Sequence, residues 1–455
     1  MEMSSEAALL ITRESCLRRS AIGWVFAIAI LAWVCWSAFA RAQFNPTDYV
    51  AWQADWQRVV ACAGDGVASP CEGVSKFPPA YLLNAGMVEG KDGSDRLHLF
   101  WLNLGALLLP LGALAAMRGA AVLFKAGWAY VAALAISPLP MFYLASGALE
   151  VQSAVFSGLY IGAVAQVITS PGLKPNAVTW CILVVSGLLF PLYKDTGALF
   201  VGLAVLLLLV TQRSVLRALW STEGGVGRLR RFVLAASMPV LVAQILAASY
   251  SWFKYGRPLP VAYMAEAEAT QPSLSTSAEF LFGSLFSPNG GLLIFWALPV
   301  FIALAGWRWV GLAPRREVLL LAGTVLLVSC LAFARWWAPF GWDGWGNRLL
   351  VPAMLSAMVA ALTNVVVPAP PSKPSANRLT VLACVPLLIC SLYYIVIPYV
   401  AEVGVPMSAS LWPGKACARM RDALGSEALT QGAAFWKSDI YYECARERML
   451  HVPAP

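Results

Sequence analysis

Long runs of apolar residues alternate with short polar segments along almost the whole chain. About eleven of these runs are long enough for an α-helix to cross the hydrocarbon core of a bilayer, which takes about 20 residues. The runs lie at residues 21–40, 98–117, 119–137, 148–169, 177–193, 196–212, 232–253, 291–312, 317–337, 349–367 and 379–400. This pattern predicts an all-α polytopic membrane protein with about 11 transmembrane helices.

The charged residues between the runs predict how the chain is oriented, because cytoplasmic loops of membrane proteins are enriched in Lys and Arg. When the N-terminus is placed in the cytoplasm, the short basic loops fall on that side and the C-terminus lies outside. One of these loops carries several arginines: Arg213, Arg217, Arg228, Arg230 and Arg231. Residues 13–42 also resemble a cleavable signal peptide, but the apolar run is long for one, so we favour a retained first helix.

Composition excludes two other classes of protein. Apolar residues make up 59% of the 455 positions and charged residues only 12%, whereas soluble domains are about a quarter charged. A water-soluble globular enzyme is therefore excluded, and the abundance of aromatic residues also excludes an intrinsically disordered chain. The net charge of +8 results from the basic cytoplasmic loops, so nucleic acid is not an expected partner.

The chain divides into a transmembrane domain and a short tail. We assign residues 1–400 to the transmembrane domain, which includes two large external segments at 41–97 and 254–290. Residues 401–455 form an external tail that is too short for a rich core of its own. In the first external segment, Tyr49–Ala61 and Tyr81–Met87 have apolar residues at helical spacing, which predicts amphipathic helices along the membrane surface.

Cysteines in the external segments predict disulfides. Cys62 and Cys71 lie in the first segment, and Cys417 and Cys444 lie in the tail. An oxidising compartment would pair each set within its own segment, so we predict one disulfide in each. The chain has only two histidines, which leaves little material for a zinc site or for histidine-based nucleophilic catalysis.

Carboxylates near the outer membrane face are the first candidates for catalysis. Asp48 follows the first apolar run by about eight residues, where partial desolvation would raise its pKa toward a value useful for a general base. The alternative is that Asp48 caps the N-terminus of the amphipathic helix that follows it. Glu150 lies inside the apolar run 148–169, and a carboxylate there is costly unless it faces a cavity or a partner.

Candidate ligands for a lipid-linked phosphate and sugar lie at the same face. Cations and aromatic side chains occur at the ends of several runs, where they can hold such a headgroup or serve only as interfacial anchors. Lys194, Lys254 and Arg257 are of this kind, and Lys76 and Tyr81 lie beside the Pro-Pro turn of the first external segment. Asn289 belongs to a Gly-rich turn before the eighth run. Trp345, Asn347 and Arg348 close a Trp- and Gly-rich segment at 336–348, where tryptophan faces suit sugar rings and an arginine suits a phosphate.

The order of these motifs resembles that of the GT-C superfamily of polyprenyl-phosphate-sugar-dependent glycosyltransferases. That superfamily includes bacterial aminoarabinose, arabinose and mannose transferases and protein O-mannosyltransferases. The motifs are an acid in the first external loop (Asp48), a Pro-Pro-x-Tyr sequence (Pro78–Tyr81), a Lys-x-Thr turn (Lys194–Thr196), an F-S-P-x-x-G-L sequence (Phe286–Leu292) and a Trp/Gly-rich turn that ends in Arg-x-Leu (Asn347–Leu350). The chain departs from the family pattern in having Gly346-Asn347-Arg348 in place of Gly-Pro-Arg, and in having Asp48 with only Asp55 as a second acid nearby.

The resemblance implies an inverting transfer at the external leaflet of a bacterial cytoplasmic membrane. Asp48 would deprotonate an acceptor hydroxyl, Glu150 would orient the acceptor or share a cation with Asp48, and Arg348 would stabilise the departing polyprenyl phosphate. The donor would be a polyprenyl-phosphate-linked sugar, and the acceptor a glycan, a lipid or a protein. The residues require no cofactor, and a role for a divalent cation, Mg²⁺ or Mn²⁺, stays open.

Two other functions fit parts of the sequence. A flippase or transporter of a lipid-linked sugar would account for Glu150 and Arg335, but the ionisable residues cluster at the predicted external face instead of the membrane midplane. An enzyme of the O-antigen polymerase or ligase type is also open, although such chains usually place their large external loop late.

Overall fold

The structure of the protein is a computed structural model. It describes residues 28, 32, 46–64, 70–71, 74, 78–80, 105, 108–117, 119, 123, 127, 130–131, 133–134, 137, 149–194, 202, 205–206, 209–210, 213–259, 274–286, 291–296, 313–314, 316–335, 348–366, 385–386 and 389.

Helices make up almost all of the described residues. The α-helices are α2 (Pro46–Gly64), α7 (Leu149–Thr169), α8 (Ala177–Tyr193), α10 (Arg213–Trp220), α11 (Gly225–Tyr255), α13 (Leu274–Phe286), α14 (Leu292–Phe295), α17 (Arg316–Phe333) and α18 (Val351–Thr363). Short 3-10 helices lie at η1 (Pro171–Leu173) and η3 (Arg348–Leu350), and the two-residue strands β1 (Ala313–Pro314) and β2 (Val365–Val366) pair antiparallel. The prediction of an all-α protein is confirmed for the described part of the chain, apart from this short ladder.

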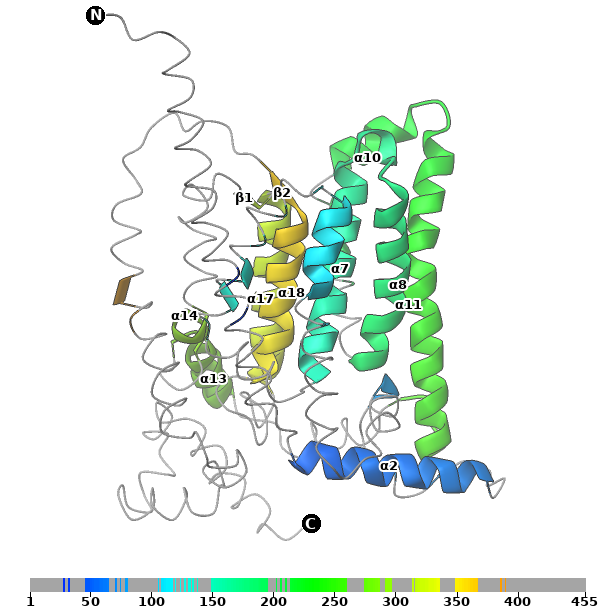
Figure 1. The fold of residues 1–455 in the computed structure, drawn as a ribbon, viewed down its shortest axis with the longest axis vertical. Coiled ribbons are helices and arrows are strands. Elements are labelled where there is room, and N and C mark those ends of the chain that lie inside the picture. The colour runs from blue at the N-terminus through cyan, green and yellow to red at the C-terminus, as the bar shows by residue number, and fades with distance from the viewer. Residues whose placement is uncertain are drawn as a thin grey trace, which may run out of the picture.

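The long helices stand side by side as a bundle (Figure 1). α17, α18, α7, α8 and α11 follow one another across it, and each packs against the next. α2 lies crosswise at one end of the bundle, and α10 lies at the other. We call these the α2 end and the α10 end.

Two of the described helices are long and apolar enough to cross a membrane, at Glu150–Thr169 and at Gly225–Tyr255. The first is mostly buried inside the bundle, whereas most of the second is exposed, including the large apolar side chains of Val233, Leu241 and Ile245. Exposed apolar surface of this kind suits contact with lipid. Shorter apolar helices lie at Leu108–Met117, Ala177–Tyr193, Glu317–Phe333 and Val351–Thr363. The number of spans stays a prediction.

Some helix ends differ from the ends of the apolar runs. α11 begins at Gly225, seven residues before the run at 232–253, so the basic segment before that run is helical instead of a loop. The same predicted loop contains α10. In the run at 349–367, the helix ends at Thr363, because Val365–Val366 pairs with Ala313–Pro314. The segment 254–290, which we predicted to be external, contains α13, a helix that the sequence pattern did not predict.

α7 and α18 approach closely because two glycines of α7 face α18. A Cβ atom added at Gly158 would lie 2.6 Å from the carbonyl oxygen of Ser356, which is closer than real side chains come. One turn further on, a Cβ at Gly162 would clash with the Thr363 hydroxyl. The Asn364 amide donates a hydrogen bond to the Gly162 carbonyl at 2.9 Å. Gly-x-x-x-Gly is the spacing that lets membrane helices pack backbone to backbone.

The other face of α7 packs against α8 and α11. The Tyr160 hydroxyl donates to the Ala236 carbonyl of α11 at 2.8 Å, and the Tyr160 ring packs on Phe190 of α8 with centroids 5.3 Å apart. A Cβ at Gly187 of α8 would lie 3.0 Å from this ring, so the glycine leaves room for it. α7 is thus enclosed between α18 on one side and the α8 and α11 pair on the other.

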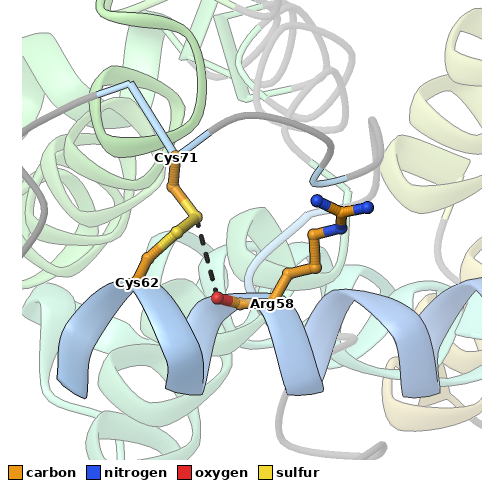
Figure 2. Close-up of a disulfide and its surroundings, with 3 residues drawn as sticks. All are labelled: Arg58, Cys62 and Cys71. Atoms are coloured by element: carbon orange, nitrogen blue, oxygen red, sulfur yellow. Dashed lines mark hydrogen bonds between the residues drawn. A yellow bond between two sulfur atoms is a disulfide. The ribbon is translucent and has the colours of Figure 1, made fainter. Parts of the chain in front are cut away.

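A disulfide and a backbone hydrogen bond hold α2 at its end of the bundle. The disulfide joins Cys62, in the last turn of α2, to Cys71, and their Cα atoms are 6.0 Å apart (Figure 2). The Cys71 sulfur lies 3.8 Å from the carbonyl oxygen of Arg58. The Cys71 N–H donates to the Phe253 carbonyl of α11 at 2.8 Å. The predicted pair Cys62 and Cys71 is confirmed, and so is a helix in the first external segment.

Three further predictions about the same face lie outside the described residues. They are the disulfide between Cys417 and Cys444, the interfacial stretch Tyr81–Met87, and the tail 401–455.

Gly158→Ala should destabilise the bundle, because the added methyl group would push α18 away from α7. We expect a loss of about 1–3 kcal/mol, seen as a lower midpoint of thermal unfolding of the protein in detergent. Gly323→Ala in α17 is the matched control, since a Cβ there meets nothing within 4 Å. An unchanged midpoint for Gly158→Ala would mean that the two helices do not pack through this glycine.

Replacing both Cys62 and Cys71 with serine should loosen α2 from the end of α11. The lost cross-link is expected to lower stability by about 2–3 kcal/mol, and trypsin should cleave faster after Arg58. Cys181→Ala is the control, because Cys181 is an exposed free cysteine of α8. Equal cleavage rates in all three proteins would show that the disulfide does not hold α2.

Candidate functional site

Several helices bring their ends together at the α2 end of the bundle. α7 begins and α8 ends there, because these two helices form an antiparallel pair joined by residues 170–176. The hydrogen bond from Cys71 to Phe253 brings α2 to the last turn of α11. Several predicted site residues belong to these elements or lie within two residues of their ends: Asp48, Glu150, Lys194, Lys254 and Arg257. Arg348 begins η3, which leads into α18 at the same end.

Asp48 lies in α2, two residues after Pro46, the first residue of this helix that the structure describes. The choice between a general base and an N-cap residue for Asp48 therefore stays a prediction.

Glu150 and Arg348 lie at the same level of the bundle. α7 and α18 run parallel, because Gly158 faces Ser356 and the later residue Gly162 faces a later part of α18. Counting back eight residues from each side of the contact at Gly158 reaches Glu150, in the first turn of α7, and Arg348, the first residue of η3. The side chain of Glu150 is buried, with 5% of its surface exposed. The fold therefore places two distant sequence motifs side by side.

Lys194 closes α8 at the same end. Its backbone N–H donates to the Phe190 carbonyl at 3.1 Å, and its side chain is half-buried. The preceding residue, Tyr193, stacks on Phe156 of α7 with ring centroids 5.5 Å apart. This contact holds Lys194 within about two turns of the start of α7.

A group of buried polar residues lies between α2 and the end of α11. The Lys254 ammonium lies 4.6 Å from the ring centroid of Tyr250 and 5.0 Å from that of Tyr255. Lys254 and Asp55 of α2 are both buried, and Asp55 lies near Tyr250. Aromatic faces stabilise a cation that has lost much of its water. Sequence reasoning selected Lys254 but gave Asp55 no role of its own, because an acid in an amphipathic stretch resembles a solvent-facing residue.

Two arginines extend the positive charge at this end. Gly256 ends α11 in the left-handed conformation, with φ of 64°, and Arg257 follows it as an exposed residue. Arg335, just beyond the end of α17, donates to the Ser277 hydroxyl of α13 at 3.1 Å. The cations of the α2 end therefore come from helices on both sides of α7.

Sequence reasoning missed three polar residues inside the bundle. Gln152, Ser137 and Trp296 are buried, and each has at least one side-chain polar atom without a hydrogen-bond partner. No signal in the sequence marks them, because a polar residue in an apolar run ordinarily finds its partner among its neighbours.

The remaining predicted site residues lie outside the described residues: Lys76, Tyr81, Asn289, Trp345 and Asn347. In the described part of the chain, no group of three or more His, Cys, Asp or Glu side chains could hold a metal ion. A role for Mg²⁺ or Mn²⁺ stays open.

Comparisons with protein-family models, with curated proteins and with solved structures found no match. The resemblance to the GT-C superfamily therefore rests on the residues of this chain alone, and its function has to be argued from the α2 end of the bundle.

Proposed function

We propose that the protein is an inverting membrane glycosyltransferase of the GT-C type. It moves a sugar from a polyprenyl-phosphate donor to an acceptor hydroxyl at the external face of the membrane. The observation that carries this proposal is the convergence, at one end of an apolar bundle, of a crosswise helix with an acid, a buried acid and several cations. A lipid-linked donor suits such an end, because its chain stays in the membrane while its headgroup reaches water.

The distribution of arginines supports an external site. α10 and the first two turns of α11 lie at the end opposite to α2 and carry Arg213, Arg217, Arg228, Arg230 and Arg231. The enrichment of Lys and Arg in cytoplasmic segments assigns this end to the cytoplasm. The disulfide at the α2 end fits an oxidising external compartment. In this proposal the α2 end faces the outside of a bacterial cytoplasmic membrane.

Asp48 acts as the general base in the proposed reaction. It takes the proton of the acceptor hydroxyl while the hydroxyl oxygen attacks the anomeric carbon of the donor sugar. The bond from that carbon to the phosphate oxygen breaks on the opposite face, so the configuration inverts and the electron pair leaves with polyprenyl phosphate. α2 carries Asp48 across the outer end of the bundle, where a lipid headgroup and an aqueous acceptor meet. Glu150 lies deeper and orients the acceptor.

Charge stabilisation is the second task, because a phosphate leaves without needing a proton. Arg348 is the main candidate, since it begins η3 level with Glu150 and a guanidinium can bind phosphate through two parallel hydrogen bonds. Lys194, Lys254 and Arg257 supply further positive charge from α8 and α11. The donor site is completed by Lys76, Tyr81, Asn289, Trp345 and Asn347.

Asp48→Asn should abolish transfer while leaving donor binding intact, because asparagine keeps the size of the side chain but accepts no proton. We expect turnover to fall by about 10²–10⁴-fold. Arg348→Ala should weaken donor binding as well as turnover. Both are measured with purified protein and radiolabelled polyprenyl-phosphate sugars, scoring transfer or hydrolysis and, separately, bound lipid.

Glu223→Gln and Arg230→Ala are the controls for this experiment, because both residues are exposed at the α10 end. They remove the same charges and should leave turnover at the wild-type level. Full turnover by Asp48→Asn would exclude Asp48 as the base. If the wild type binds the lipid but does not turn it over with any of the acceptor extracts, a flippase of the same lipid becomes the better interpretation.

Single cysteines should report the orientation of the bundle. In a background that retains the Cys62 and Cys71 disulfide but lacks the other cysteines, a membrane-impermeant maleimide should label Pro258→Cys in intact cells. Glu223→Cys, in the exposed turn between α10 and α11, should be labelled only after the membrane is permeabilised. The background protein without an added cysteine is the control. The reverse pattern would contradict an external α2 end.

A further inference from the structure

Three polar side chains are buried in the apolar core of the bundle without completing their hydrogen bonds in the protein. Gln152 is 5% exposed, and neither atom of its amide has a partner. Ser137 and Trp296 are both 0% exposed, and the hydroxyl of the first and the indole N–H of the second also lack a partner. A buried polar group in this state costs free energy, and folded proteins keep few of them.

One apolar cluster connects the three residues. Trp296 belongs to it, and so does Val155, which lies on the same face of α7 as Gln152 because it follows three residues later. Leu134, three residues before Ser137, belongs to the same cluster. Trp296 therefore belongs to one apolar cluster, and Gln152 and Ser137 each lie one turn from a member of it.

This core borders the candidate site. Gln152 lies in the first turn of α7, two residues after Glu150. Trp296 follows α14 directly and shares its cluster with Leu350 and Val351, where η3 passes into α18. η3 begins at Arg348, two residues before Leu350. Gln152 thus lies next to Glu150 along α7, and Trp296 shares an apolar cluster with the residues that follow Arg348.

We infer that Gln152, Ser137 and Trp296 bind the hydroxyl groups of the donor's sugar, an inference that rests on the proposed glycosyltransferase function. The Gln152 amide has an acceptor and two donors, so it can pair with two adjacent hydroxyls of a sugar ring, each of which both donates and accepts. Trp296 donates through its indole N–H, and Ser137 can do either. An ionised phosphate only accepts hydrogen bonds and would leave the Gln152 carbonyl unpaired. The charged residues then hold the phosphate, and these neutral residues select the sugar.

Gln152→Leu provides the test, because leucine has a similar size and needs no hydrogen bond. The probes are a short-chain polyprenyl phosphate that carries a hexose, one that carries a pentose, and the same polyprenyl phosphate without a sugar. Binding and the midpoint of thermal unfolding are measured for each. We expect the wild type to bind at least one sugar-bearing lipid more tightly than the sugar-free lipid. In Gln152→Leu, the ratio of the affinities for the sugar-bearing and the sugar-free lipid should fall by about tenfold or more. The variant should bind the sugar-free lipid as the wild type does. Without lipid, its midpoint of thermal unfolding should be no lower than that of the wild type.

Gln166→Leu is the matched control. Gln166 lies on the same helix at the other end, and the oxygen of its amide is also buried without a partner. This variant should retain the wild-type preference for the sugar-bearing lipid. Trp296→Phe keeps most of the ring but removes the N–H donor, so it should weaken the same preference and serves if Gln152→Leu does not fold.

The outcomes separate this inference from the proposed function. If the wild type binds sugar-bearing and sugar-free lipids equally, the hydrogen bonds of the three side chains are made by water and the inference is overturned. Binding of the lipid would still support the proposed function. If Gln152→Leu unfolds at a lower temperature and keeps the sugar preference, Gln152 is structural and the inference fails. If no lipid binds to the wild type, the proposed function fails, and the inference fails with it.

Discussion

The contact between Gly158 of α7 and the backbone of α18 is the constraint on which the rest of the bundle depends. Between helices in lipid there is no hydrophobic driving force, so close van der Waals packing and interhelical hydrogen bonds have to hold them together. The glycines at 158 and 162 allow that approach, and the hydrogen bond from Asn364 to the Gly162 carbonyl adds a polar contact in a buried position. Because the two helices run parallel, the same contact sets the starts of α7 and η3 at one level. It thereby brings Glu150 and Arg348 to the same part of the protein.

A chain of contacts leads from this pair to the crosswise helix. Tyr160 joins α7 to α11 through the Ala236 carbonyl, and α11 extends to Phe253, whose carbonyl accepts the hydrogen bond from Cys71. Cys71 is joined in turn to Cys62 of α2. The position of Asp48 relative to Glu150 is therefore determined by helix packing, one backbone hydrogen bond and one disulfide. The proposed base would be held by the scaffold on such a helix, although its segment is predicted to lie outside the membrane.

Buried polar groups collect at the end where chemistry is proposed. Lys254 contacts the rings of Tyr250 and Tyr255, and Asp55 also lies near Tyr250. In the core, the amide of Gln152 has no hydrogen-bond partner. Groups like these add little to stability, because removing them from water costs about as much as their interactions return. A ligand that carries both a phosphate and hydroxyl groups would use charged and neutral groups in this arrangement. In a bundle that served only as a membrane anchor, the same buried polar groups would lower stability without any gain in function.

The sequence by itself determined the features that depend on local order: an apolar helical chain, the Cys62 and Cys71 pair, and the choice of Asp48, Glu150 and Arg348 as unusual charges. Periodicity and charge can be read along the chain because each residue contributes to them without its distant neighbours. Only the tertiary structure decided that Gly158 meets α18, that Asp55 is buried under the end of α11, and that Gln152 has no partner. These properties depend on which segments far apart in sequence pack together, and one apolar run resembles another until their side chains meet.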